Sequence, residues 1–168
     1  PVLSLDASKA PGRIIAITLR LTAEHIIPAQ NSMHMPLSLN DLENHLFKCA
    51  DIIRDAVDPT DYKEYILPLV YYKSISDEFE KQYEQNVEEY GEDFARRKNL
   101  YDIPVVPEGY LWDDLRAVSD NVDQSLNEAF DALVEENSEL TGVFLADYID
   151  ADALDDDRLG KLVEHLTT

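Results

Sequence analysis

The side chains best suited to contact a nucleic acid are three consecutive cations in the segment FARRKN. Arg96, Arg97 and Lys98 form the only basic cluster in the chain. Guanidinium and ammonium groups in a row can bind phosphate oxygens, although such a short run also occurs at the solvated end of a helix. We therefore predict that these three residues form the nucleic-acid contact, and the solvated helix end stays open as the alternative.

The remaining residue types give no pattern typical of a reaction centre. The five glycines are isolated, so no glycine-rich turn is available to approach a phosphate. The four histidines lack zinc-ligand spacing, and the single cysteine, Cys49, lies on the apolar side of a predicted helix. Carboxylates are so numerous that close pairs arise by chance. We predict no catalytic, cofactor-binding or metal-binding residue in this chain.

The net charge is the unusual feature of the composition. Fourteen Lys and Arg stand against 35 Asp and Glu, which gives −21 in 168 residues. Such a surface repels phosphate backbones at ordinary ionic strength, whereas molar salt shortens the screening length to about 3 Å and removes most of that repulsion. Three interpretations stay open: a protein from a halophilic host, a protein that imitates nucleic acid, or a strongly solvated surface.

Composition and length favour one globular domain in the cytoplasm. Hydrophobic residues make up 45% of the chain, which excludes an acidic disordered tail. No apolar run reaches the ~18 residues of a membrane span, and the first residues lack the pattern of a signal peptide. A single cysteine excludes an internal disulfide and suits a reducing compartment. We therefore expect no membrane partner.

The elements that must position these side chains are predicted to be helices that follow a boundary near Met35. Residues 1–34 carry three basic and two acidic side chains, unlike the acidic remainder. Within them, IAITLRL at 15–21 alternates with the period of two that predicts one short strand. We assign 1–35 to an N-terminal extension whose status stays open. Residues 36–168 are predicted to form one mainly all-α domain, a compact helical bundle.

Apolar spacing of three and four residues predicts the first two helices of this bundle. The first begins at Ser38 or Asn40, either of which can cap it. Its apolar stripe consists of Leu39, Leu42, Leu46, Ala50 and Ile53. The second, long helix runs from about 59 to 83 and bends at Pro68, because proline removes a backbone donor. Its stripe consists of Tyr62, Tyr65, Ile66, Leu69, Tyr72, Ser76, Phe79 and Tyr83, which favours a curved core helix over a recognition surface.

The later segments alternate between loop and helix. Residues 101–110 are expected to be extended or turned because they contain Pro104, Pro107 and Gly109. Helical spacing resumes at 111, with Trp112 as a core anchor and a break near Ser119. Asn137 and Gly142 are candidate helix ends, and a last helix is predicted with the three aspartates at 155–157 in its first turn.

Several motifs follow one another in a specific order. FKCADIIR (47–54) matches six of the eight positions of the signature W/F-K-A-A-D-I-L-R, all but Cys49 and Ile53. YKEYI (62–66) and KSISDEFE (73–80) match the motifs that follow it, Y-K-x-Y-I/V and K-x-I/L-S-D-x-F-E. IPVVPEGYLWDDLR (103–116) and LNEAFDALVEENSELTGVF (126–144) continue the pattern. Over 38–166 the chain thus resembles the N-terminal helical domain of the modification (HsdM-type) subunit of type I restriction-modification systems.

The resemblance implies a parent enzyme that transfers a methyl group from S-adenosylmethionine to the exocyclic amine of adenine in duplex DNA. The cofactor motif and the N-P-P-F/Y tetrapeptide of that family lie in its next domain, and neither occurs here. We therefore expect an N-terminal fragment that neither methylates DNA nor binds S-adenosylmethionine by itself. It would support methylation by packing on the catalytic domain and helping to close the complex on DNA.

The partners implied by the resemblance are the protein's own catalytic domain, the specificity subunit, a second modification subunit, the restriction subunit and duplex DNA. A net charge of −21 is unusual for a module that faces DNA, and a halophilic host would reconcile the two. Two alternatives stay open: an acidic DNA mimic, and a helical protein–protein adaptor.

Overall fold

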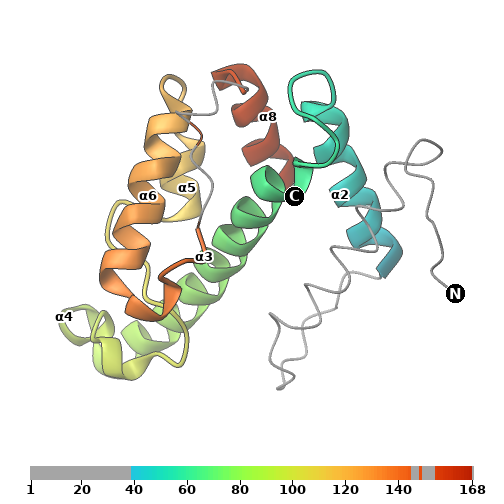
Figure 1. The fold of residues 1–168 in the computed structure, drawn as a ribbon. Helices are drawn as coiled ribbons and strands as arrows, with labels where there is room; N and C mark the ends of the chain where they lie inside the picture. The colour runs from blue at the N-terminus through green and yellow to red at the C-terminus, as the bar shows by residue number, and fades with distance from the viewer. Residues whose placement is uncertain (1–38, 145–147, 149–153, 168) are drawn as a thin grey trace, which may run out of the picture. The chain divides into compact units, whose positions relative to one another are not determined.

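The computed structural model describes residues 39–144, 148 and 154–167, and every regular element in these ranges is a helix (Figure 1). In chain order they are α2 (Leu39–Ile53), α3 (Tyr62–Tyr90), α4 (Glu92–Ala95), η1 (Lys98–Leu100), α5 (Trp112–Arg116), α6 (Val122–Glu136), η2 (Ser138–Leu140) and α8 (Asp156–Thr167), where η marks a 3₁₀-helix. The mainly all-α fold predicted from apolar spacing is confirmed. The predicted extension over 1–35, with its strand and its boundary near Met35, lies outside the described residues and stays a prediction.

The chain divides into two compact units between Leu67 and Pro68, and α2 belongs to the first. The predicted stripe of α2 is buried at Leu46, Ala50 and Ile53, and Cys49 beside them has no exposed surface. Burial raises the pKa of the Cys49 thiol to about 12. At pH 8 the thiol is therefore almost entirely protonated. Cys49 is a core group, as its place on the apolar side of the predicted helix indicated.

Asp58 organises the turn before α3. One oxygen of its carboxylate accepts hydrogen bonds from the backbone amide of Thr60 at 2.9 Å and from the Thr60 hydroxyl at 2.7 Å, and these bonds lower the pKa of Asp58. The residue therefore stabilises a turn and does not cap a helix that begins at Pro59. Instead, α3 begins at Tyr62, whose hydroxyl donates to the Arg54 carbonyl oxygen at 3.2 Å.

The long helix α3 extends further than its apolar stripe predicted. It passes through Pro68 and continues to Tyr90, because the stretch that follows Tyr83 is rich in Glu and Gln, which are good helix formers. Gly91 ends the helix with a φ of 81°, a left-handed conformation that favours glycine. The bend expected at Pro68 stays a prediction.

Within the second unit, α3 contributes a buried face that is fixed by polar bonds. Leu69, Tyr72, Ser76 and Phe79 have no exposed surface. The Tyr72 hydroxyl donates to the Tyr110 carbonyl oxygen at 2.6 Å, and the Ser76 hydroxyl oxygen accepts from the Trp112 amide at 2.7 Å. These two bonds attach the loop before α5 to α3. The interpretation of the tyrosine-rich segment as a core helix is therefore confirmed for this unit.

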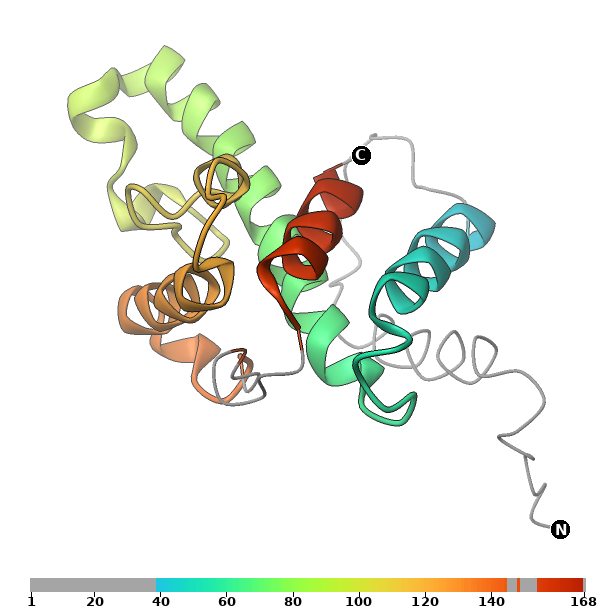
Figure 2. The ribbon, with the colours of Figure 1, turned by 90° about the horizontal axis from the view of Figure 1, so that it is seen from above.

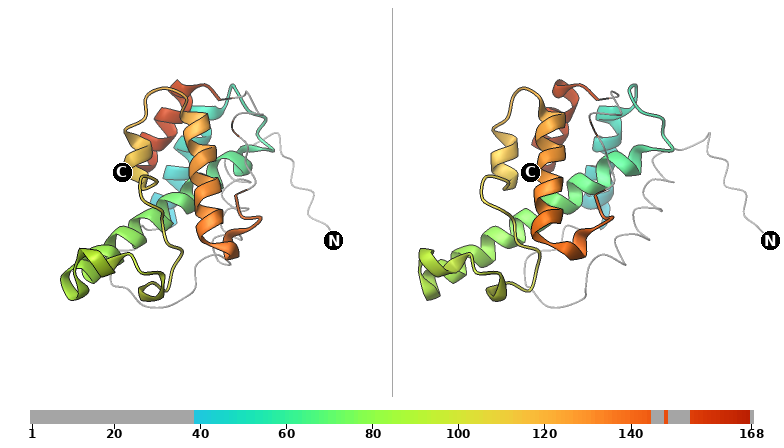
Figure 3. Two further views of the ribbon diagram at one scale, coloured as in Figure 1. Left: turned by 90° about the vertical axis from the view of Figure 1, so that its left-hand side faces the viewer. Right: turned by 60° about the vertical axis from the view of Figure 1, so that its left-hand side comes forward.

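Helix α6 packs against α5 and α8, which also contact each other (Figures 2 and 3). The break predicted near Ser119 is present, since α5 ends at Arg116 and α6 begins at Val122. Asp156, the first residue of α8, caps α6. Its carboxylate accepts from the Val122 amide at 2.8 Å and from the Asn121 amide at 3.0 Å. A side chain 34 residues away therefore satisfies the free amides at the start of α6.

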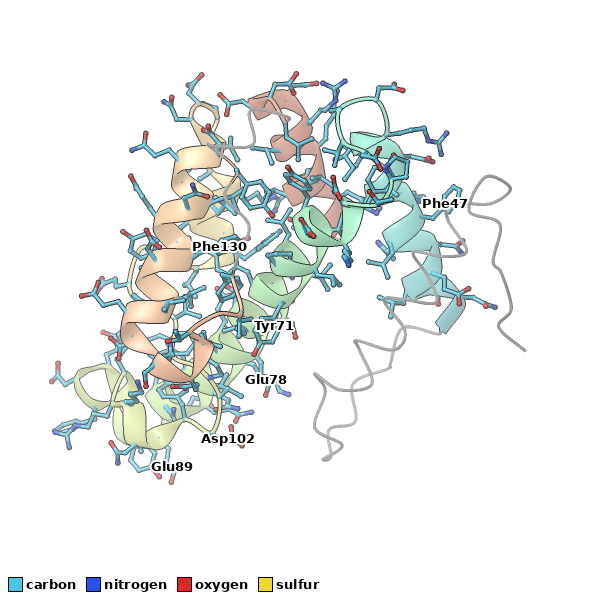
Figure 4. The ribbon with its side chains drawn as sticks, viewed as in Figure 1. Phe47, Tyr71, Glu78, Glu89, Asp102 and Phe130 are labelled. Carbon is cyan, nitrogen blue, oxygen red and sulfur yellow. The ribbon has the colours of Figure 1, made fainter. Side chains whose placement is uncertain are left out.

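An aromatic cluster fills the space between α3, α5 and α6. The ring of Tyr72 meets Trp112 edge-on with 5.4 Å between centroids and Phe130 with 5.9 Å, and Phe130 stacks on Phe144 at 4.5 Å (Phe130 is labelled in Figure 4). The indole N–H of Trp112 donates to the Thr167 hydroxyl oxygen at 2.9 Å. Trp112 is the core anchor that its position predicted.

Asn137 joins the end of α6 to the extended loop at 101–111. Its side-chain oxygen accepts from the Val105 amide at 2.8 Å, and its amide nitrogen donates to the carbonyl oxygens of Val105 at 2.8 Å and Leu133 at 2.9 Å. Asn137 and Val105 are both buried. The backbone amide and carbonyl of Val105 therefore both pair with the Asn137 side chain, as they would pair with a neighbouring strand.

Candidate functional site

Arg96, the first of the three predicted nucleic-acid contacts, is bound to the core of the second unit. Its guanidinium carbon lies 5.0 Å from the ring centroid of Tyr83 and 5.7 Å from that of Phe79, within the range of cation–π attraction. Its Nη1 donates to the Val106 carbonyl oxygen at 3.3 Å. These contacts attach the turn after α4 to α3, so Arg96 has a structural function.

Arg97 and Lys98 are exposed but have different partners. The guanidinium carbon of Arg97 lies 4.3 Å from the ring centroid of Phe94, which is itself 45% exposed. Lys98 donates to the Glu136 carbonyl oxygen, and its ammonium lies 4.0 Å from the Glu136 carboxylate. The three cations are therefore adjacent in sequence but not equivalent in the fold. Their contact with phosphate stays a prediction.

Four carboxylates precede this basic segment in the chain. Glu88 and Glu89 lie in the last turn of α3, and Glu92 and Asp93 in the first turn of α4; all four are exposed. The hydroxyl of Tyr90 is hydrogen-bonded to Glu89, and that bond and the charge of Glu89 raise the pKa of Tyr90 (Glu89 is labelled in Figure 4). Negative charge that precedes the basic segment in the chain weakens the attraction of a phosphate at low salt.

A pocket of about 330 Å³ lies elsewhere in the second unit, among α3, the loop before α5, and α6; we call it the Tyr110 pocket. It is lined by Tyr72, Glu108, Gly109, Tyr110, Asp114, Leu115, Val118, Ser125, Glu128 and Ala129. Tyr72, Leu115 and Ala129 are buried and form an apolar floor. Glu108, Asp114 and Glu128 are exposed and place carboxylates at the rim.

Hydrogen bonds hold the walls of the Tyr110 pocket. The bond from the Tyr72 hydroxyl to the Tyr110 carbonyl oxygen fixes the loop, and the Asp114 carboxylate accepts from the Leu111 amide at 2.9 Å. The Glu128 carboxylate accepts from the Gln124 side-chain amide at 2.7 Å. Burial, followed by the charge of Asp114, raises the pKa of Tyr72, so its hydroxyl stays protonated and keeps its bond.

Sequence reasoning did not find the Tyr110 pocket. Its lining residues come from segments more than 50 positions apart, and no spacing rule joins Tyr72 to Glu128. The local signal was the stretch PEGYLWDD, in which a turn glycine and carboxylates flank two aromatic residues. That signal predicts a turn but not a concave surface.

Residues 39–144, 148 and 154–167 contain no group of three or more His, Cys, Asp or Glu side chains arranged to hold a metal ion. Among the helices of these same ranges, none combines the length and the hydropathy of a membrane span.

A family model described as the HsdM N-terminal domain matches residues 42–166. The match begins in α2 and ends in α8, so it covers part of the first compact unit and nearly all of the second. No curated protein matches the chain.

Proposed function

Because the chain belongs to the HsdM N-terminal domain family, and thus to the modification subunit of a type I restriction-modification system, we propose that it is the helical docking domain of an adenine-specific DNA methyltransferase. The parent enzyme transfers a methyl group from S-adenosylmethionine to the exocyclic amine of adenine in duplex DNA. The match over 42–166 carries this proposal. The same match supports an assembly with a specificity subunit, a second modification subunit and a restriction subunit.

A domain without a reaction centre can still govern methyl transfer through geometry. The target adenine has to leave the base stack and be held in the catalytic domain, which costs a few kcal/mol. Orienting the DNA and the cofactor relative to each other lowers the barrier to the transfer step. We propose that the chain packs on the catalytic domain and helps the complex close around the duplex, and that the binding of S-adenosylmethionine and the chemistry belong to the catalytic domain.

We propose that the basic segment contributes to this closure through Arg97 and Lys98. Arg96 is held by Tyr83, Phe79 and Val106, so it keeps the turn in place. The side chains of Arg97 and Lys98 are exposed; Arg97 can neutralise one phosphate directly, and Lys98 can do so by leaving its contacts with Glu136.

The net charge of −21 supports a halophilic host as part of the proposal. At molar salt the screening length is about 3 Å, so acidic side chains repel the DNA backbone only at contact distance. A complex that works under those conditions gains little from phosphate attraction and depends on shape and apolar contact. The chain is then expected to act in the cytoplasm, where the DNA is.

The test is a methyl-transfer assay with the whole modification subunit, assembled with its specificity subunit, and with a version that lacks residues 39–167. We expect the shortened protein to retain S-adenosylmethionine binding while transfer to adenine falls by about a hundredfold, because the DNA is no longer oriented. Arg97→Ala with Lys98→Ala in the intact subunit is expected to weaken DNA binding. The slope of the logarithm of the binding constant against the logarithm of the salt concentration should fall by the contribution of about two phosphate contacts. Lys161→Ala on α8 is the control for loss of an exposed cation.

Unchanged methyl transfer after removal of 39–167 would contradict the proposed function. Loss of S-adenosylmethionine binding by a shortened protein that is still folded would also contradict it, since the cofactor site would then include this chain.

A further inference from the structure

We propose that the Tyr110 pocket binds the side chain of an arginine presented by another subunit of the assembly. The inference deepens the proposed docking function and rests on it for the identity of the partner. The pocket itself is a property of the second compact unit, since all of its lining residues lie between 72 and 129.

The shape of the pocket suits one long side chain with an apolar stem. Its volume of about 330 Å³ is near the lower limit of small-molecule sites. The floor is made by the buried residues Tyr72, Leu115 and Ala129, against which methylene groups can pack. The two tethers at Tyr110 and Leu111 fix the loop, so little ordering is required when a ligand enters.

The charge of the pocket selects a cation. Glu108, Asp114 and Glu128 lie at the rim, and none of the ten lining residues is basic. The ion pairs within the described part of the chain use other carboxylates; for example, Arg116 on α5 binds Glu164 with both carboxylate oxygens. A cation entering the pocket would therefore form ion pairs that the folded chain does not already supply.

The type of cation follows from the arrangement of the carboxylates. The described ranges contain no group of three His, Cys, Asp or Glu side chains placed to hold a metal ion. A guanidinium is planar, has five donors and can bridge separated carboxylates, and it can also stack on an aromatic ring such as that of Tyr110. A lysine ammonium is a compact charge that satisfies fewer of these groups at once.

The test is an NMR titration of the 168-residue chain with Nα-acetyl-arginine amide as the probe. We expect saturable shifts of the backbone amide signals of Gly109, Tyr110 and Ser125. Glu108→Gln with Glu128→Gln should weaken binding at least about tenfold, because two charge-assisted contacts are lost. Glu84→Gln with Glu88→Gln, on the exposed face of α3, changes the net charge equally and should leave binding unchanged.

Three results would overturn the proposal. The first is shifts spread evenly over the acidic surface, or an equal loss in the control variant, since either means attraction to net charge alone. The second is equal binding of Nα-acetyl-citrulline amide, which has the same shape without the charge. The third is displacement of the probe by S-adenosylmethionine, since the pocket would then be a cofactor site.

The same pair of variants in the whole complex separates this inference from the proposed function. We expect Glu108→Gln with Glu128→Gln to weaken the association of the modification subunit with another subunit by about tenfold. If the isolated chain binds the probe but subunit association is unchanged, the assignment to a partner subunit is wrong. The role in methylation would still stand on the deletion experiment.

Discussion

Replacement of Trp112 with alanine is expected to lower the free energy of unfolding by about 3–5 kcal/mol. The side chain is 1% exposed and meets the ring of Tyr72 edge-on, so its removal leaves a cavity at the centre of the second unit. It also removes the hydrogen bond from the indole N–H to Thr167, which attaches α8 to α5. Because a domain is stable by only about 5–15 kcal/mol, this one change removes a large fraction of the total.

Urea denaturation followed by far-UV circular dichroism measures this loss, since the variant has no tryptophan for fluorescence. Trp112→Phe is the matched control, because it keeps an aromatic ring in the core and loses the bond to Thr167. We expect it to cost about half as much as Trp112→Ala. A loss below about 1 kcal/mol for Trp112→Ala would show that Trp112 is not a core anchor.

Replacement of Asn137 with alanine is expected to cost about 2–4 kcal/mol, although the residue is small and polar. The variant leaves the amide and the carbonyl oxygen of Val105 without their bonds to the Asn137 side chain, and Val105 is buried. Unpaired backbone groups in an apolar surrounding cost more than the lost bonds themselves. The loop at 101–111 should therefore detach from α6 before the helices unfold.

Hydrogen exchange measures the detachment of the loop, and urea denaturation measures the total loss of stability. Asn99→Ala is the control, because Asn99 is exposed in η1, and a change there is expected to stay within about 0.5 kcal/mol. Equal stability of the Asn137 and Asn99 variants would mean that water replaces the side chain of Asn137 and that the loop is held by its own contacts.

Local apolar spacing predicted the helices because an amphipathic helix is encoded within a few turns of sequence. Helix α6 illustrates this, since Val122, Leu126, Phe130 and Leu133 recur at intervals of three and four residues and are all buried. The end of α3 was predicted too early, because its last turns are charged and have no stripe to follow. The Glu- and Gln-rich composition of these last turns was a better guide to where the helix ends.

The candidate site was less predictable because it depends on contacts between distant residues. The hydrogen bond from the Val122 amide to Asp156, which caps α6, joins residues 34 positions apart. The hydrogen bond from the Val105 amide to the Asn137 side chain joins residues 32 positions apart. The basic segment shows the same limit. Sequence presents Arg96 and Arg97 as equivalent, whereas the fold places Phe79 and Tyr83 against Arg96 and leaves Arg97 over an exposed ring.

The central claim is that this chain supplies docking surface to a methyltransferase whose reacting groups belong to another domain. Isothermal titration calorimetry of the 168-residue chain against the catalytic part of the modification subunit tests it most directly. We predict binding with a Kd on the order of 1 μM and a negative heat-capacity change from buried apolar surface, and no heat when S-adenosylmethionine is added to the chain alone. No binding to the catalytic part, or binding of S-adenosylmethionine by the isolated chain, would contradict the account.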